Sequence, residues 1–189
     1  DIPNNQIWYT SMDNDVITPS TIAFGGAVIV SNVYENGKGI ITFDEDVTTI
    51  GSNALSDMDF TSITIPNSVT TIESNAFGAY LYEFTVPESV VSIDELAFKS
   101  CQHIYSFKGK FASSDNKCLI VDNKLIAFVN RETSYNIPEG VTAIGESAFN
   151  SKAITNITLP SSLLSIGKNA FRTTPLTSIT IPNSVTTIG

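Results

Sequence analysis

Cys101 and His103 are the two residues of this sequence whose side chains and spacing suggest nucleophilic chemistry. A thiol or hydroxyl nucleophile needs a base, and His103 is the only histidine in the chain. However, Cys101 closely follows Ala97-Phe98, at a corner of a repeated unit where a small buried side chain fits, and a buried thiol is inert. We therefore favour a structural role for Cys101 and predict that the chain is not an enzyme.

Acidic residues gather at four places where a cation could bind: Asp13 and Asp15, Asp44 to Asp46, Asp57 and Asp59, and Asp94-Glu95. A calcium loop needs glycine at its sixth position and glutamate at its twelfth, and the stretch that begins at Asp13 has neither. The two cysteines also lack the spacing of a metal site. We predict no metal and no cofactor, and we interpret these acids as solvated turn residues.

A repeat of the pattern I-T-I-P-x-S-V-T-x-I-G-x-x-A-F organises most of the chain. Four full copies and a shorter final one begin at Ile63, Phe84, Tyr135, Ile157 and Ile179. A degenerate copy begins at Ile41, with Asp44 and Leu55 where the other copies have proline and phenylalanine. About six repeats therefore occupy residues 41–189.

Each copy predicts a strand, a turn and a second short extended stretch. Ile63 and Ile65 alternate with polar residues, which is the period of a strand with one buried face. Pro66 cannot donate to a strand ladder, so the chain turns there, and residues 69–72 are extended again. Asn-Ala-Phe at 75–77 predicts a tight turn or one 3-10 turn. The phenylalanines at this corner are expected to stack in the core: Phe77, Phe98, Phe149 and Phe171.

Two segments depart from the repeat. Residues 1–40 contain the strand-like IWYT at 7–10 and the first strand of a hairpin, which returns through a glycine-containing turn, and we expect a β cap over the first repeat. Near 104–132, inside the array, we expect a strand from Ile104 to Lys108 and a β-hairpin, CLIV and KLIAFV, turning at Asp122-Asn123. We interpret this second segment as an insertion rather than a domain.

The repeat is similar to that of BspA-like leucine-rich-repeat proteins of bacterial cell surfaces, over about Ile41 to Gly189. The segment from Phe111 to Gly145 also resembles an insertion of gut-bacterial members. This resemblance implies a β-rich leucine-rich-repeat solenoid, right-handed and horseshoe-like, with short turns or 3-10 segments. It also implies a secreted or surface-anchored protein, without catalytic residues, that contacts host proteins or other bacteria.

The departures from the family pattern are Asp44, Leu55 and the stop after Gly189, before the next Ala-Phe. From this uncapped last repeat we expect either a longer natural chain or self-association through its open face.

Composition and charge limit the partners. The chain of 189 residues is 42% hydrophobic and 15% charged, which is typical of a folded protein. Its net charge of -9 has the wrong sign for phosphates, so we expect no nucleic-acid partner. No apolar run reaches the roughly 18 residues of a spanning helix, so we expect no integral membrane segment.

Asp1 in place of a first methionine would fit a removed signal segment and an exported protein, in which Cys101 and Cys118 could pair. The sequence leaves that pairing open.

A row of polar side chains on the predicted strand face is the candidate binding surface. The residue two before each proline should point outward: Thr64, Thr85, Asn136, Thr158 and Thr180, flanked by Ser62, Glu83, Ser134, Asn156 and Ser178. Such a line of hydroxyls and amides could hydrogen-bond a partner, or it could simply keep an exposed sheet soluble. Binding hot spots are usually aromatic or Arg, so Tyr80, Tyr82 and Tyr105 are further candidate anchors.

The leading hypothesis is a non-enzymatic recognition or adhesion module that binds a host or bacterial macromolecule, protein or glycan, through this repeat face. Polysaccharide capture for nutrient uptake is the alternative, and it requires exposed aromatic residues in the cap or the insertion. A structural spacer for a further domain is the third possibility.

Overall fold

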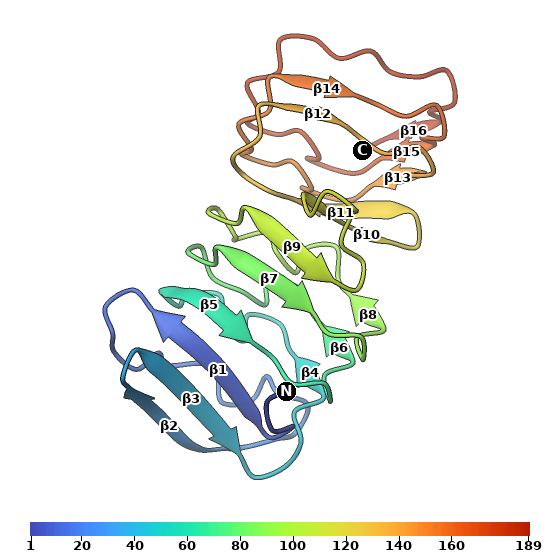
Figure 1. The fold of residues 1–189 in the computed structure, drawn as a ribbon. Coiled ribbons are helices and arrows are strands. Elements are labelled where there is room, and N and C mark those ends of the chain that lie inside the picture. The colour runs from blue at the N-terminus through green and yellow to red at the C-terminus, as the bar shows by residue number, and fades with distance from the viewer.

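The computed structural model describes all 189 residues, and it is built from strands and turns without a helix. Its turns stack along one axis as a solenoid, with the N-terminal sheet at one end and the last repeats at the other (Figure 1). The strands are β1 (Gln6–Ser11), β2 (Ile29–Glu35), β3 (Lys38–Phe43), β4 (Thr49–Ile50), β5 (Phe60–Thr64), β6 (Thr71–Ile72), β7 (Glu83–Val86), β8 (Ser92–Ile93), β9 (Ser106–Gly109), β10 (Cys118–Val121), β11 (Lys124–Phe128), β12 (Ser134–Asn136), β13 (Ala143–Ile144), β14 (Asn156–Thr158), β15 (Ser165–Ile166) and β16 (Thr187–Ile188).

Each repeat contributes to two sides of the solenoid. The long-strand side carries β5, β7, β9, β12 and β14, and the short-strand side carries β4, β6, β8, β11, β13, β15 and β16 (Figure 1). Short strands of successive repeats pair in parallel, with Ile50 opposite Ile72 and Ile72 opposite Ile93. The predicted order of strand, proline turn and short strand is confirmed, although the second strand covers only two residues because Val69 closes the turn by donating its N–H to the Pro66 carbonyl.

The corner before each phenylalanine is a tight turn, and no 3-10 segment forms. At four of the corners a left-handed residue stands two positions before the phenylalanine, or before Leu55 in the first copy, and it ends any helical turn; the Phe98 corner has Leu96 there, without a positive φ. Asn53, Asn75, Ser147 and Asn169 occupy this position with φ of 57°, 54°, 59° and 56°. Asparagine tolerates this conformation better than most residues, because its short polar side chain can hydrogen-bond locally.

A serine in three of the proline turns ties successive repeats together. The Oγ–H of Ser68 donates to the Val47 carbonyl at 2.7 Å, Ser89 donates to Val69 at 2.6 Å, and Ser162 donates to Val141 at 2.8 Å. These bonds satisfy carbonyls that the short strands leave without a partner. The repeat that follows the insertion has Gly140 here, with φ of 92°, and therefore lacks this side-chain bond.

The N-terminal segment forms an antiparallel sheet with the strand order β2-β3-β1-β5. β3 contains Ile41–Phe43 of the degenerate first repeat, so β1 lies between strands of the first and second repeats. The β2–β3 hairpin turns at Asn36 and Gly37, with φ of 51° and 78°, as a two-residue turn of this type requires. Phe24 packs on Phe43 with ring centroids 4.8 Å apart and closes the core at this end.

The inserted hairpin replaces one short strand but interrupts both sides of the solenoid. β11 pairs in parallel with β13, with Leu125 opposite Ile144, and the hairpin turns at Asp122-Asn123 as predicted. β10 forms the edge of that sheet, so β8 does not pair with it, and β9 does not pair with β12. A hollow of about 520 Å³ opens on the short-strand side, beside Ser92, Asp94, Val121 and Asp122.

The apolar core stays continuous across this interruption. Its 46 buried residues form one cluster along the whole axis, so the insertion breaks the backbone ladders without dividing the core. The predicted phenylalanine stack is confirmed as two groups. Phe77 lies 5.1 Å from Phe98 between ring centroids, and Phe149 lies 5.2 Å from Phe171. Phe128 of the hairpin joins the second group at 4.7 Å from Phe149.

The phenylalanines of the stack should contribute unequally to the free energy of unfolding along the axis. We expect Phe149→Ala to lower the free energy of unfolding by about 3–5 kcal/mol, because the fully buried ring leaves a cavity between two neighbours. Phe171→Ala, whose ring is half-buried, should cost clearly less. Urea unfolding followed by circular dichroism measures both, and equal losses would contradict this account of the core.

Candidate binding surface

The structure separates the two residues that could have formed a catalytic pair. Cys101 is 1% exposed and lies in the core, where its Sγ is 3.8 Å from the Phe77 carbonyl oxygen. Burial raises the pKa of the Cys101 thiol to about 12. His103 is exposed, on the outside of the same corner, and stacks on Tyr80. His103 is therefore not placed as a base for this thiol, and the buried thiol has no access to a substrate.

Both cysteines are free thiols. Cys118 lies in the core of the hairpin, with its Sγ 3.4 Å from the Tyr135 hydroxyl, and its pKa is raised mainly by burial. Cys101 and Cys118 therefore act as small core residues and are not bonded to each other.

Lys152 is the lysine whose surroundings perturb it most. Burial lowers its pKa to about 8, and its Nζ donates to the Cys101 carbonyl at 3.2 Å across the interruption made by the insertion. The hollow beside it measures only about 10 Å³, which holds one water at most. Lys152 thus ties the two halves of the solenoid together, in a place without room for a substrate.

The acidic residues are solvated turn residues in the structure. Asp44 accepts the Val28 N–H at 2.7 Å, and Asp94 accepts the Leu96 N–H at 2.9 Å. No group of three or more His, Cys, Asp or Glu side chains is placed to hold a metal ion. These carboxylates cap turns by accepting backbone N–H groups.

The predicted polar row lies on the surface, but it is not one continuous ladder. Thr64, Thr85, Asn136, Thr158 and Thr180 are all exposed. Asn136 and Thr158 are direct neighbours in register, whereas Thr180 lies outside any strand. Between Thr85 and Asn136 stands β9, where Lys108 is opposite Thr85. The insertion thus interrupts the row with a cation.

The residues that flank the polar row differ in the contacts that their side chains make. Ser62 hydrogen-bonds Thr10 of β1, and Ser134 is opposite Asn156. Lys108 Nζ lies 2.9 Å from Glu83 Oε2, so this acid is already paired. Ser178, like Thr180, is exposed outside any strand.

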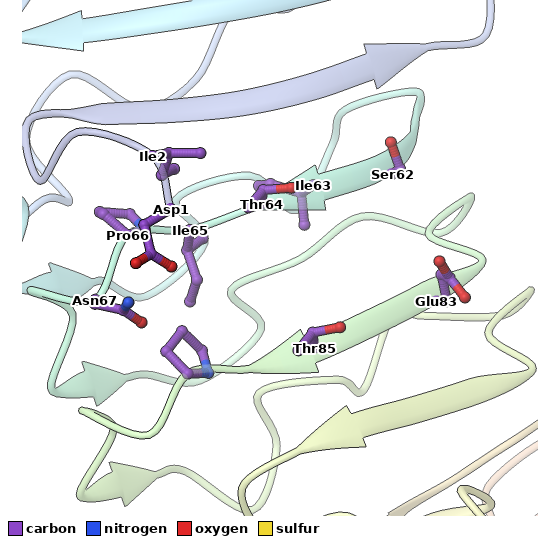
Figure 2. Close-up of a pocket in the computed structure, with 11 residues that line it drawn as sticks. Asp1, Ile2, Ser62, Ile63, Thr64, Ile65, Pro66, Asn67, Glu83 and Thr85 are labelled. Atoms are coloured by element: carbon purple, nitrogen blue, oxygen red, sulfur yellow. The ribbon is translucent and has the colours of Figure 1, made fainter.

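A groove of about 510 Å³ follows the row between β5 and β7 (Figure 2). These two strands belong to different sheets and are joined near their starts by a bond from the Tyr82 N–H to the Thr61 carbonyl at 3.1 Å. Thr64 and Thr85 lie on its two walls, and Asp1 and Ile2 lie near Pro66 at its far end (Figure 2). A groove that combines threonine hydroxyls with the apolar side chains of Ile63, Ile65 and Pro66 therefore accompanies the first half of the predicted row.

Trp8 extends this face toward the N-terminus. β1 pairs with β5 so that Trp8 is directly opposite Thr64, and the indole is half-buried on the same face as the threonine. Lys38 Nζ lies 2.9 Å from the centre of the Trp8 ring, and the indole N–H donates to the Gln6 side chain at 2.8 Å. Sequence reasoning missed Trp8 as a neighbour of Thr64, because nothing in IWYT indicates which strand β1 pairs with.

The tyrosines proposed as anchors lie at the edge where β7 and β9 begin. Tyr105 is 43% exposed, and Tyr80 and Tyr82 are half-buried. Tyr82 and Tyr105 contact each other with ring centroids 6.1 Å apart. The structure therefore brings these candidates together, next to the flanking residue Glu83 at the start of β7.

The sequence from 14 to 119 and from 124 to 189 matches the model of the BspA type leucine rich repeat region, in six copies. The chain belongs to this family. BspA-type repeats thus account for most of the chain, and the match begins within the segment that we expected to form the cap. No curated protein matches the sequence significantly.

Two solved structures have the same fold. A leucine rich cell surface protein from Faecalibacterium prausnitzii is 24% identical, with a TM-score of 0.59. The match covers 76% of this BspA-type chain and 48% of the Faecalibacterium chain. The pneumococcal vaccine antigen PcpA is 18% identical, with a TM-score of 0.52. The match covers 83% of this chain and 60% of the PcpA chain. The leucine-rich-repeat fold is thereby confirmed, and this chain spans about half of each neighbour's length or slightly more. In the structure itself, no helix has the length and apolar character needed to cross a bilayer.

Both cysteines should be unreactive in the folded protein. We expect no labelling by a thiol reagent at about pH 8, because the raised pKa of each buried thiol keeps it protonated there. After unfolding in guanidinium both should label, since the ordinary pKa is then restored. Mass spectrometry counts the labels, and an unreduced protein lighter by two hydrogens would reveal a disulfide and refute the prediction.

Proposed function

We propose that this chain is a non-enzymatic recognition module of an exported or cell-surface protein, and that it binds a protein partner through the long-strand side. The observation that carries the proposal is the exposed polar row together with the groove beside Thr64 and Thr85. The cell-surface location of the Faecalibacterium protein supports the proposed location, since the fold is shared.

The groove suits an extended polar partner. Its walls present threonine hydroxyls, and its two strands are not joined by a ladder, so the facing strand edges can bond to a partner's main chain. Trp8, opposite Thr64, supplies the large aromatic surface that the row itself lacks. Together these residues give a surface with polar specificity and one aromatic anchor.

Polysaccharide capture is the alternative that a specific observation favours. It requires exposed aromatics, and the structure has half-buried Trp8 in the N-terminal sheet and exposed Tyr105 beside the insertion. Binding to glycans but not to proteins would select this alternative, and a spacer for a further domain would bind neither.

Negative charge placed on the polar row should weaken binding. We expect the double variant Thr64→Glu, Thr158→Glu to lose about tenfold or more in affinity, because two carboxylates would be desolvated at the interface. The matched control is Thr70→Glu, Leu164→Glu, which adds the same charge to exposed positions of the same two repeats beside β6 and β15. Biolayer interferometry against a panel of host matrix glycoproteins and gut polysaccharides measures both.

The control pair makes the outcome specific. Loss of affinity in the Thr64→Glu, Thr158→Glu variant alone, with an unchanged circular dichroism spectrum, supports recognition by the long-strand side. Equal loss in both variants would point to net charge instead, and no binding by the parent protein would favour the spacer.

A further inference from the structure

Five side chains form a line of contacting groups at the edge where β7 and β9 begin, and we call them the edge cluster: Tyr80, His103, Tyr82, Tyr105 and Arg131. Ring centroids are 5.0 Å apart from Tyr80 to His103, 6.5 Å from His103 to Tyr82 and 6.1 Å from Tyr82 to Tyr105. The Arg131 guanidinium lies 5.0 Å from the Tyr105 ring. The cluster is therefore a continuous strip.

The insertion completes the cluster. Tyr80 and Tyr82 come from the repeat that contains β7, and His103 and Tyr105 precede β9. Asn130, at the exit of the hairpin, donates its N–H to the Ile104 carbonyl at 2.8 Å and its side-chain amide to the Gln102 carbonyl. These two bonds hold the following residue, Arg131, beside Tyr105.

The polar atoms of the cluster are largely unused by the protein. No phenol hydroxyl of the three tyrosines has a hydrogen-bond partner, and Arg131 forms neither an ion pair nor a side-chain hydrogen bond. His103 Nδ1 lies 3.1 Å from the Ala79 carbonyl, so this nitrogen donates and Nε2 remains free. An exposed cluster with this many free donors and acceptors is equipped for a ligand.

The local charge favours an anionic group although the whole chain carries a net charge of -9. The acids that adjoin Tyr82 and Arg131 in the sequence are already neutralised, since Glu83 is paired with Lys108 and Glu132 with Lys117, each at 2.9 Å. Arg131 is therefore the uncompensated charge of this edge. Its planar fork of N–H donors matches a carboxylate in a two-point contact.

We propose that the edge cluster binds a carboxylated sugar, with the carboxylate on Arg131 and the sugar rings on the aromatic strip. A pyranose ring has an apolar C–H face and a rim of hydroxyls, and the tyrosines offer an apolar ring with a polar tip. None of the hollows described above is lined by these residues, and an open aromatic edge suits the flat C–H face of a sugar ring. The site uses none of the residues of the polar row.

The probes are two carboxylated glycans with neutral partners: sialyllactose beside lactose, and a glucuronate-containing hexasaccharide beside its carboxyl-reduced form. Titration calorimetry and saturation-transfer NMR on the full chain should show binding of at least one carboxylated member, with its neutral partner about tenfold weaker or worse. Which member binds identifies the source of the carboxylate.

Three variants test the assigned residues. Arg131→Ala should weaken binding about tenfold or more, and Tyr105→Ala should do the same, whereas Tyr105→Phe keeps the ring and should retain most affinity. Arg172→Ala is the matched control, because it removes an exposed arginine from the far end of the chain, and it should have no effect. Thr64→Glu should also have no effect, which separates this site from the polar row.

Several outcomes would overturn the proposal. Binding of neither carboxylated probe at millimolar concentration would do so, as would equal binding of the neutral partners. Unchanged affinity of Arg131→Ala with a native circular dichroism spectrum would also reject it. Saturation transfer in the parent complex should fall on the sugar C–H face, a readout that does not depend on any variant folding.

Discussion

The fold depends on the contact between successive repeats, because no single repeat can bury its own apolar side chains. Ile72 is buried only because Ile50 lies on one side of it and Ile93 on the other. The serine bonds, such as that of Ser89 to the Val69 carbonyl, follow the same rule, since donor and acceptor belong to different repeats. Stability is therefore a property of interfaces between neighbours, as in other solenoids.

This constraint explains how the array tolerates an insertion. A new segment needs to supply only the groups that its neighbour requires, and the hairpin does so with Leu125 opposite Ile144 and Phe128 against Phe149. The remaining ladder bonds are lost, and single contacts such as Lys152 to the Cys101 carbonyl and Lys124 to Glu95 replace them. Core continuity is thus preserved at the expense of backbone pairing.

The sequence allowed prediction of what is periodic and local. The prolines, the alternating isoleucines and the Asp122-Asn123 turn each have a direct local cause, and each lies where expected. Long-range pairing has no such local signal. The antiparallel placement of β1 between β3 and β5 could not be read from IWYT, so the position of Trp8 beside Thr64 was missed. The predicted alternative of a 3-10 turn at 75–77 was wrong for a local reason, because Asn75 adopts a left-handed conformation.

The same distinction separates the two candidate surfaces. The polar row was predictable because it repeats, and for that reason threonine's preference for strands is enough to explain most of it. The edge cluster does not repeat: Tyr105 and Arg131 come from the insertion, and no other repeat has an arginine held against a tyrosine. The stacking of repeats requires the periodic residues of every repeat but does not require Arg131, whose guanidinium forms no ion pair in the protein. Departures from the repeat are therefore the more informative guide to binding in this solenoid.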